Sequence, residues 1–355
     1  MNMHSMGWDV GGAHLKRAGL DQAGQLHVAQ EPCPLWLGTE RLESALARIM
    51  AGQGRAPGCR HVVTMTGELA DCFSGRKAGV ATLARLMTQW LAPEPVAFFA
   101  GSRRLLTTPD QAAQCWEQVA SANWLATAHW TARSLPDALL VDIGSTTTDL
   151  IVIQDGLIQT RGYSDAERMR YDELLYTGVV RTPLMALATR VPHDGEWLPV
   201  MAEQFATTAD VYRLTGELPT LADQQPSADG GDKTLTGSAR RLARMLGLEA
   251  ESFSLAYWQT HARIWRERQI ERLMASLMRQ LSRGCLKPGT PLVGVGVGRF
   301  LVRECALRLC RPYRDIDEFF PPCYSAPACS AADCAPAAAL ACLAARNGFF
   351  DDDPN

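Results

Sequence analysis

The sequence predicts an α/β protein built from two similar domains, and three observations support this. The chain has 355 residues, which is enough for two domains with separate hydrophobic cores. Apolar runs typical of buried strands alternate with segments whose apolar residues recur at helical spacing. One short pattern also occurs twice, at Trp8–Lys16 and at Val141–Asp149. A strand–turn–strand repeated at the start of two α/β segments indicates a duplicated architecture with a central cleft.

The first domain is predicted to span residues 1–135, with a helical insertion over about 70–130. A helix is predicted over 39–51, where "TERLESALARIMA" has apolar residues at helical spacing. Strands are predicted where apolar runs are bounded by glycine or polar residues. These runs are a strand–turn–strand over 6–20 and single strands over 24–30, 61–68 and 95–100.

The second domain is predicted to span residues 136–355, with a helical insertion over about 165–285. Its strands are predicted over 139–142, 149–154, 157–163 and 291–298. Its helices are predicted over 234–248, 254–285, 299–310 and, in a run of small residues, 335–345. The segment 222–233, "ADQQPSADGGDK", is rich in Gly, Pro and Asp and predicts a flexible loop.

The two copies of the repeat, "WDVGGAHLK" and "VDIGSTTTD", share the order apolar, Asp, apolar, Gly, small. A glycine in such a turn lets the backbone bring N–H groups and hydroxyls close to phosphate oxygens. The predicted phosphate-binding residues are Gly11, Gly12, His14, Lys16, Gly144, Ser145, Thr146 and Thr147. Asp9 and Asp142 would repel a bare polyphosphate, so they predict Mg²⁺ between carboxylate and phosphate, held directly or through water. The alternative for each loop is a β-turn closed by its own Asp side chain.

Further acidic residues are candidates because of their position beside predicted strands. Glu68 lies at the end of the strand over 61–68 and Asp71 just after it, where functional groups of α/β folds commonly lie, and either can accept a proton. The alternative for Asp71 is a helix cap. Asp149 is a third candidate metal ligand; it can orient a hydroxyl or metal-bound water, or simply close the turn. The catalytic candidates are therefore Asp9, Asp142, Glu68 and Asp71.

Other motifs allow two interpretations each. Arg181 can grip a diphosphate or a carboxylate with two hydrogen bonds, or form an ordinary ion pair. Trp124 and Tyr212 can stack on an aromatic substrate or belong to the core. The glycines of "GVGVG" can place a nucleotide at a helix N-terminus, or let that helix approach its strand. These glycines are Gly294, Gly296 and Gly298.

The composition bounds the class of protein. Apolar residues make up 47% of the chain, charged residues 21%, and the formal net charge is -3, which gives no reason to expect nucleic acid or a membrane as partner. No apolar run approaches the roughly 20 residues of a membrane helix. Eleven cysteines without a C-x-x-C pattern or a secretory signal predict reduced thiols in the cytoplasm rather than a metal cluster.

The paired loops followed by a late glycine-rich loop resemble the superfamily of actin, heat-shock chaperones and sugar kinases. Within it, the chain resembles the hydantoinase/oxoprolinase-like branch and, more narrowly, the methanofuran-biosynthesis synthases and their bacterial relatives in tetrahydromethanopterin-linked one-carbon transfer. The resemblance rests on "GWDVGGAHLK", "TMTGELADCF", "ANWLATA", "LLVDIGSTTTDLI", "YTGVVRTPL", "FATTADVYRLTGEL" and "GVGVGRFL", in that order. It implies two RNase-H-like domains with mixed sheets flanked by helices.

The resemblance also implies a reaction. In it, the phenol of a glutamyl-tyramine or glutamyl-tyrosine compound displaces diphosphate from an aminomethylfuran-methyl diphosphate and forms an ether. Mg²⁺ is the implied cofactor, while ATP is possible but not required. Two other functions remain open: an ATP-dependent small-molecule kinase or hydantoinase/oxoprolinase-like enzyme, and a non-catalytic binding module switched by a nucleotide.

Overall fold

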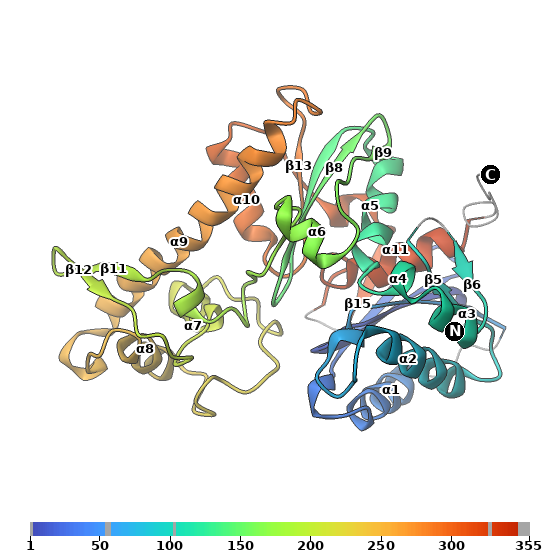
Figure 1. The fold of residues 1–355 in the computed structure, drawn as a ribbon, viewed down its shortest axis with the longest axis horizontal. Helices are drawn as coiled ribbons and strands as arrows, with labels where there is room; N and C mark the ends of the chain where they lie inside the picture. Colours follow the sequence, from blue (N-terminus) through green and yellow to red (C-terminus); the bar gives the residue numbers. More distant parts are fainter. Residues whose placement is uncertain (1–2, 54–57, 102–103, 326–328, 347–355) are drawn as a thin grey trace. The chain divides into compact units, whose positions relative to one another are not determined.

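The structure of the protein is a computed structural model that describes residues 3–53, 58–101, 104–325 and 329–346. The chain forms two compact units. Unit 1 contains the residues up to Pro136, the segment Asp155–Ile158 and the residues from Asp315 onward. Unit 2 contains Asp137–Gln154 and Gln159–Arg314. Each unit has its own sheet with helices packed against it (Figure 1).

Within the described residues, the sheet of unit 1 has seven strands in the order β15-β3-β2-β1-β4-β5-β6. Their bounds are β1 Met3–Val10, β2 His14–Asp21, β3 Leu26–Pro32, β4 Arg60–Met65, β5 Val96–Phe99, β6 Leu105–Leu106 and β15 Cys323–Ser325. Strands β1 to β3 form an antiparallel meander, whereas β4 runs parallel to β1 and β5 parallel to β4. This is the arrangement of an RNase-H-like domain, which confirms the predicted fold class.

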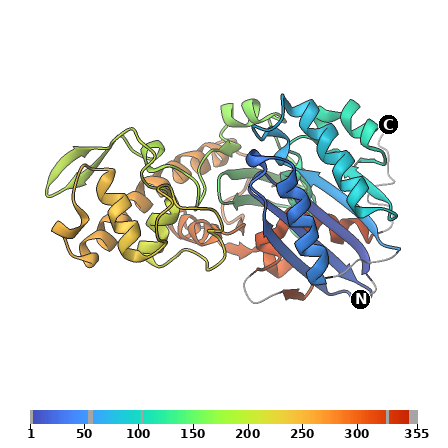
Figure 2. The same cartoon turned by 90° about the horizontal axis from the view of Figure 1, so that it is seen from below.

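Helices cover both faces of this sheet (Figures 1 and 2). The first face carries α1 (Glu40–Gln53) and α2 (Arg76–Leu91), and the other carries α5 (Asn123–Ser134) and α11 (Ala335–Ala344). The shorter helices of unit 1 are α3 Pro109–Gln114, α4 Trp116–Val119, η1 Leu35–Leu37, η2 Gly67–Leu69, η5 Ile316–Phe319 and η6 Ala332–Cys334. The core between these layers includes Trp8, Leu15, Val63 and Phe98, each fully buried.

The C-terminal helix α11 belongs to unit 1, whereas the sequence assigned everything after residue 136 to the second domain. The reason is its contact with β1, the central strand. A Cβ atom on Gly7 of β1 would lie 1.9 Å from the carbonyl oxygen of Ala337, so only glycine allows the helix to lie this close. Ser5 Oγ also donates to the carbonyl of Ala341, at 2.6 Å. Helix α11 therefore completes the layer over the strand that carries Asp9.

The sheet of unit 2 has the strand order β10-β8-β7-β13-β14, which repeats the order β3-β2-β1-β4-β5 of unit 1. The bounds are β7 Ala138–Ile143, β8 Thr148–Gln154, β10 Leu174–Leu175, β13 Leu292–Val295 and β14 Tyr313–Asp315, with a short β9 at Leu157–Ile158. β7 and β8 are antiparallel, like β1 and β2 of unit 1, and β13 runs parallel to β7, as β4 runs parallel to β1. β7 and β8 correspond to β1 and β2, as the internal repeat predicted.

The helices of unit 2 are α6 Asp165–Arg170, α7 Thr208–Thr215, α8 Leu235–Arg244, α9 Leu255–Leu281, α10 Arg299–Arg308, η3 Leu184–Ala186 and η4 Ala250–Ser252. Helix α10 packs on β13 and β7, and the long α9 runs from the sheet into the helical insertion (Figure 1). That insertion also holds a hairpin of β11 (Arg190–His193) and β12 (Glu196–Pro199). It has a separate core, which includes Val211, Leu242 and Trp258.

Two segments differ from the simple sequence pattern. The strand expected over 157–163 ends at Ile158, because Thr160 Oγ1 and the N–H of Arg161 bind the Glu173 carboxylate instead of a neighbouring strand. The predicted loop over 222–233 has no helix or strand, but ion pairs fasten it: Asp229 pairs with Arg241 at 3.0 Å. Among the described residues, no helix is long and apolar enough to cross a membrane.

Candidate functional site

Asp9 lies near the end of β1, between Lys16 on β2 and Thr64 on β4. Its side chain is buried, with 5% of the residue exposed. Burial raises the pKa of Asp9 from its ordinary value of 3.8 to about 6, although the Lys16 charge and a hydrogen bond with Asn123 act to lower it. No donor among the described residues reaches its Oδ1 atom. A buried carboxylate oxygen without a donor is an acceptor that a cation or an ordered water can satisfy.

The turn between β1 and β2 is closed by a hydrogen bond from the N–H of Gly11 to the carbonyl of His14, at 3.0 Å. A Cβ atom on Gly11 would lie 2.9 Å from that same carbonyl oxygen, so the turn requires glycine there. Gly12 has open space instead, and both glycines are partly exposed. His14 is buried as the first residue of β2 rather than held in the loop.

Glu68 and Asp71 follow β4 but differ in their surroundings. Glu68 in η2 is fully buried, and its Oε1 accepts a hydrogen bond from Ser121 Oγ at 2.9 Å. Asp71 is exposed in the turn before α2. The N-cap of α2 is Gly75, so Asp71 does not cap that helix. Glu68 is therefore buried and hydrogen-bonded within unit 1, while Asp71 is exposed to solvent.

Asn123 and Ser121 are the residues that sequence reasoning missed. Ser121 lies in the turn that leads into α5, and Asn123 is the first residue of that helix; a bridge between Met65 and Ala120 joins this part of the chain to β4. Through this turn, Asn123 reaches Asp9 and Ser121 reaches Glu68. The motif "ANWLATA" supplied the only signal, because nothing local in the sequence shows that this helix start lies beside the end of β1.

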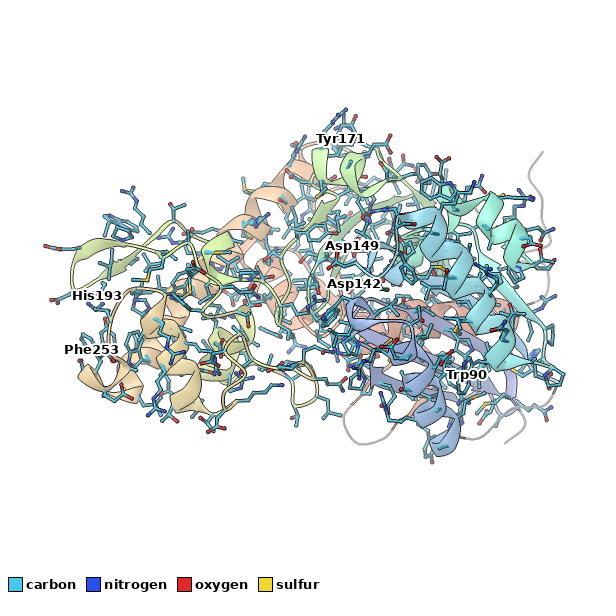
Figure 3. The ribbon with its side chains drawn as sticks, turned by 60° about the horizontal axis from the view of Figure 1, so that its bottom comes forward. Trp90, Asp142, Asp149, Tyr171, His193 and Phe253 are labelled. Atoms are coloured by element: carbon cyan, nitrogen blue, oxygen red, sulfur yellow. The ribbon has the colours of Figure 1, made fainter. Side chains whose placement is uncertain are left out.

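In unit 2, Asp142 occupies on β7 the place that Asp9 has on β1. It lies directly opposite Asp149 of β8 in the register of the two strands, and Figure 3 labels both side chains. Asp142 is partly exposed. A Cβ atom on Gly296 would lie 2.5 Å from Asp142 Oδ1. Gly296 also has a φ of 77°, a left-handed conformation that favours glycine, so this residue leaves room for the Asp142 carboxylate.

Asp149 has a partner within unit 2. Its Oδ1 accepts a hydrogen bond from Arg168 Nη1 at 2.8 Å, and the Arg168 side chain is 2% exposed. Burial raises the pKa of Asp149, whereas the Arg168 charge acts to lower it. A carboxylate already neutralised by a buried arginine is poorly suited to hold a metal.

The loop Gly144–Thr147 between β7 and β8 is the candidate phosphate loop. Its ends are joined by a hydrogen bond from the N–H of Gly144 to the carbonyl of Thr147, at 2.9 Å. The side chains of Ser145, Thr146 and Thr147 are partly exposed, whereas the next residue, Thr148, is fully buried. Three hydroxyls at a partly exposed turn are donors that suit phosphate oxygens.

The motif "YTGVVRTPL", residues 176–184, packs against this loop. A Cβ atom on Gly178 would lie 2.4 Å from the backbone nitrogen of Thr146, so the two segments touch through glycine. The N–H of Arg181 donates to the carbonyl of Ser145 at 2.8 Å, and its guanidinium Nη1 donates to Thr146 Oγ1 at 3.4 Å. Arg181 is thereby brought next to the hydroxyls of the loop, as a phosphate-binding role requires.

A buried network in turn holds Gly178. Gln269 of α9 donates to its carbonyl at 2.9 Å, and Thr208 Oγ1 at the start of α7 donates to it at the same distance. Tyr212 donates to Gln269 through its hydroxyl and is fully buried.

Trp124 of unit 1 is also buried, at 3% exposed. Both aromatic residues therefore belong to the cores and do not present a stacking surface.

The three glycines of "GVGVG" are each in close contact with the chain itself. Gly294 lies in β13 against the ring of Tyr313, Gly296 lies against Asp142, and Gly298 lies against Ile143. The N–H of Gly298 also donates to the carbonyl of Ile143 at 2.8 Å. Glycines are needed here because α10 packs closely onto the sheet, and Gly296 leaves room for the Asp142 side chain.

Comparison with known proteins gives matches in sequence over most of the chain. The family profile described as Hydantoinase/oxoprolinase matches residues 60–337. A relative from Methanocaldococcus jannaschii is 29% identical over 252 residues, covering 71% of this chain and 74% of the relative. It is named as the synthase of a furan-2-yl methanamine that carries a γ-L-glutamylaminoethyl-phenoxymethyl group. A synthase of the same name from Methanococcus vannielii is 34% identical over 110 residues, which cover 31% of this chain and 49% of that relative.

Solved structures are similar in fold. A nucleotide-free acetone carboxylase gives a TM-score of 0.51 at 8% identity, covering 84% of this chain and 66% of that one. A ROK family glucokinase from Streptomyces griseus, solved with glucose and AMPPNP, gives a TM-score of 0.45 at 14% identity over 96% of this chain and 98% of its own. At these identities the acetone carboxylase likeness concerns the fold alone.

Proposed function

Because the chain belongs to the hydantoinase/oxoprolinase family, we propose that it is a transferase of methanofuran-type cofactor biosynthesis. The resemblance to methanofuran synthases predicted from the motifs is confirmed by the names of the two archaeal relatives. Those names describe a compound in which a phenoxy oxygen joins a furan-methyl carbon. For this chain we propose the corresponding reaction: a glutamyl-tyramine or glutamyl-tyrosine phenol attacks an aminomethylfuran-methyl diphosphate, forming the ether and releasing diphosphate.

The observation that carries the proposal is the duplication of an Asp-containing turn on two RNase-H-like sheets. Asp9 and Asp142 occupy equivalent positions on β1 and β7, each followed by a tight glycine turn. The turn of unit 2 adds three hydroxyls and the Arg181 guanidinium, an arrangement that supports binding of a diphosphate leaving group. We assign diphosphate binding to this loop.

The carboxylates also fit a hard cation. Asp9 Oδ1 is buried without a donor among the described residues, and burial raises the pKa of Asp9 even though the Lys16 charge acts to lower it. No three His, Cys, Asp or Glu side chains gather as a metal site in the described chain. Mg²⁺ keeps several waters and takes phosphate oxygens as ligands, so a single carboxylate can be enough protein contact for it. We propose Asp9 in unit 1 and Asp142 in unit 2 as Mg²⁺ ligands, directly or through water, and a bound Mg²⁺ would offset the charge of the departing diphosphate.

The chain's own residues then have separate tasks. The bond from the phenol oxygen to the furan-methyl carbon forms while the bond from that carbon to the diphosphate oxygen breaks. The phenolic proton needs an acceptor, for which we propose the exposed Asp71 rather than Glu68, whose side chain is fully buried and bonded to Ser121. Arg181 and the hydroxyls of 145–147 orient the diphosphate.

The test is direct reconstitution. The protein is incubated with Mg²⁺, the furan-methyl diphosphate and γ-glutamyl-tyramine or γ-glutamyl-tyrosine, and mass spectrometry and a diphosphate assay follow both products. We expect ether and diphosphate in equal amounts. If a folded protein forms neither, the proposal is wrong. A thermal-shift response to Mg·ATP but not to Mg·diphosphate would favour a kinase instead.

A further inference from the structure

Two cysteines of unit 1 lie within reach of one another at the start of α11. The Sγ atoms of Cys329 and Cys334 are 3.3 Å apart. A disulfide needs about 2.05 Å between sulfur atoms, so a movement of only about 1 Å would allow the bond. Cys334 is fully buried at the N-cap of α11, while Cys329 is partly exposed.

The segment that joins the two cysteines is fixed by its own hydrogen bonds. The N–H and Oγ of Ser330 both donate to Asp333 Oδ2, at 2.9 and 3.1 Å. The N–H of Ala332 donates to Asp317 Oδ1 at 2.7 Å. These bonds hold the backbone between the two cysteines in a closed turn.

The electrostatic surroundings make the two thiols unequal. The hydrogen bond from Cys334 lowers the pKa of Cys329, and the positive charge of Lys16 acts in the same direction. The pKa of Cys334 is raised by its bond with Cys329 and by burial. Cys329 is also the more exposed of the two. A partly exposed thiol with a lowered pKa beside a buried one is the arrangement of an attacking and a resolving cysteine.

We propose that Cys329 and Cys334 are a redox-active pair that forms a reversible disulfide with low-molecular-weight disulfides as the oxidant. The thiolate of Cys329 attacks one sulfur of the small disulfide and expels the first small thiol. The sulfur of Cys334 then attacks Cys329 in the mixed disulfide, expels the second small thiol and leaves the internal bond. Two electrons pass from the protein to the small disulfide, and the two thiol protons end on the two released thiols.

The position of the pair connects it to the rest of unit 1. Lys16 acts electrostatically on both cysteines and on Asp9, which it faces across β1 and β2. Helix α11, which begins at the pair, packs on β1. Oxidation removes the thiolate that the Lys16 charge favours. The disulfide itself is expected whether or not the protein is a transferase.

The test uses the full-length reduced protein. It is equilibrated with glutathione and glutathione disulfide at increasing oxidation, quenched in acid, alkylated and analysed by tandem mass spectrometry. We expect Cys329 and Cys334 to lose two hydrogen atoms together and to escape alkylation, and added dithiothreitol to restore both thiols. The exposed Cys310 serves as the internal control and is expected to be alkylated or to carry glutathione, without an internal bond.

Two variants separate the roles. In Cys334→Ser, Cys329 is expected to stop at the mixed disulfide with glutathione, and in Cys329→Ser, Cys334 is expected to gain no adduct. The second variant changes the more exposed residue, so it preserves a test if the first does not fold. The proposal is overturned if Cys329 and Cys334 are still both alkylated when Cys310 already carries glutathione. It is equally overturned if Cys329 links to Cys323, its other cysteine neighbour.

Discussion

Replacing Asp9 with asparagine removes a carboxylate that is buried near the end of β1. Burial raises its pKa from 3.8 to about 6, so the charged form is destabilised in the folded protein at neutral pH. Asparagine has nearly the same shape and carries no charge. We therefore expect Asp9→Asn to be more stable than the parent protein at neutral pH, although it removes a group that we assign to Mg²⁺.

The magnitude follows from the two pKa values. Between about pH 4 and about pH 6 the folded state binds more protons at Asp9 than the unfolded state, so the free energy of unfolding falls as the pH rises through this window. Above about pH 6 the decrease in the free energy of unfolding is complete and amounts to ~3 kcal/mol, since each tenfold change in proton affinity corresponds to about 1.4 kcal/mol. The stability advantage of Asp9→Asn should thus grow from near zero at about pH 4 to roughly 1–3 kcal/mol at about pH 8.

The assay is urea or thermal unfolding of both proteins without Mg²⁺ from about pH 5 to about pH 8. Asp71→Asn is the matched control, since it makes the same chemical change at an exposed residue. Excess Mg²⁺ should stabilise the parent protein and not Asp9→Asn. A variant that is less stable than the parent at about pH 8, or an advantage that does not depend on pH, would refute this reasoning.

The remaining predictions concern unit 2. Asp142→Asn should fold normally and lose about 100-fold or more in ether formation, measured by mass spectrometry; activity near that of the parent would exclude a role for this carboxylate. Gly296→Ala should lower the free energy of unfolding by about 2 kcal/mol or more, because a Cβ atom would lie 2.5 Å from Asp142 Oδ1. Gly156 also has a left-handed φ but has open space around it, so Gly156→Ala should lower the free energy of unfolding in urea by only about 1 kcal/mol and retain activity. Gln269→Leu should lower stability by about 2–4 kcal/mol and weaken Mg·diphosphate binding about tenfold by calorimetry, since the carbonyl of Gly178 loses one of its donors and the Tyr212 hydroxyl loses its acceptor; unchanged binding would show that the loop does not depend on this support.

The duplicated turns were predictable from the sequence because each is local. In β1–β2 and β7–β8, an apolar run, an Asp and a glycine turn follow one another directly, so the repeat was visible without any long-range contact. The family resemblance then implied the two RNase-H-like domains around them. The same local logic identified the hydroxyls of 145–147.

The features that escaped prediction depend on residues far apart in the chain. Asn123 reaches Asp9 only because the start of α5 lies beside β4, and α11 joins unit 1 only because Gly7 leaves space for it. Gly178 likewise supports a loop more than 30 residues earlier. Periodicity and turn chemistry report on neighbours in sequence, and such contacts leave no trace in them.

The measurement that tests the central claim most directly follows the phenol oxygen. The glutamyl-tyramine or glutamyl-tyrosine substrate is labelled with oxygen-18 at the phenol and incubated with the protein, Mg²⁺ and the furan-methyl diphosphate. The proposed reaction predicts that the ether retains the label and that the released diphosphate contains none. Absence of the ether, or an unlabelled ether, or a phosphorylated phenol that carries the label, would contradict it.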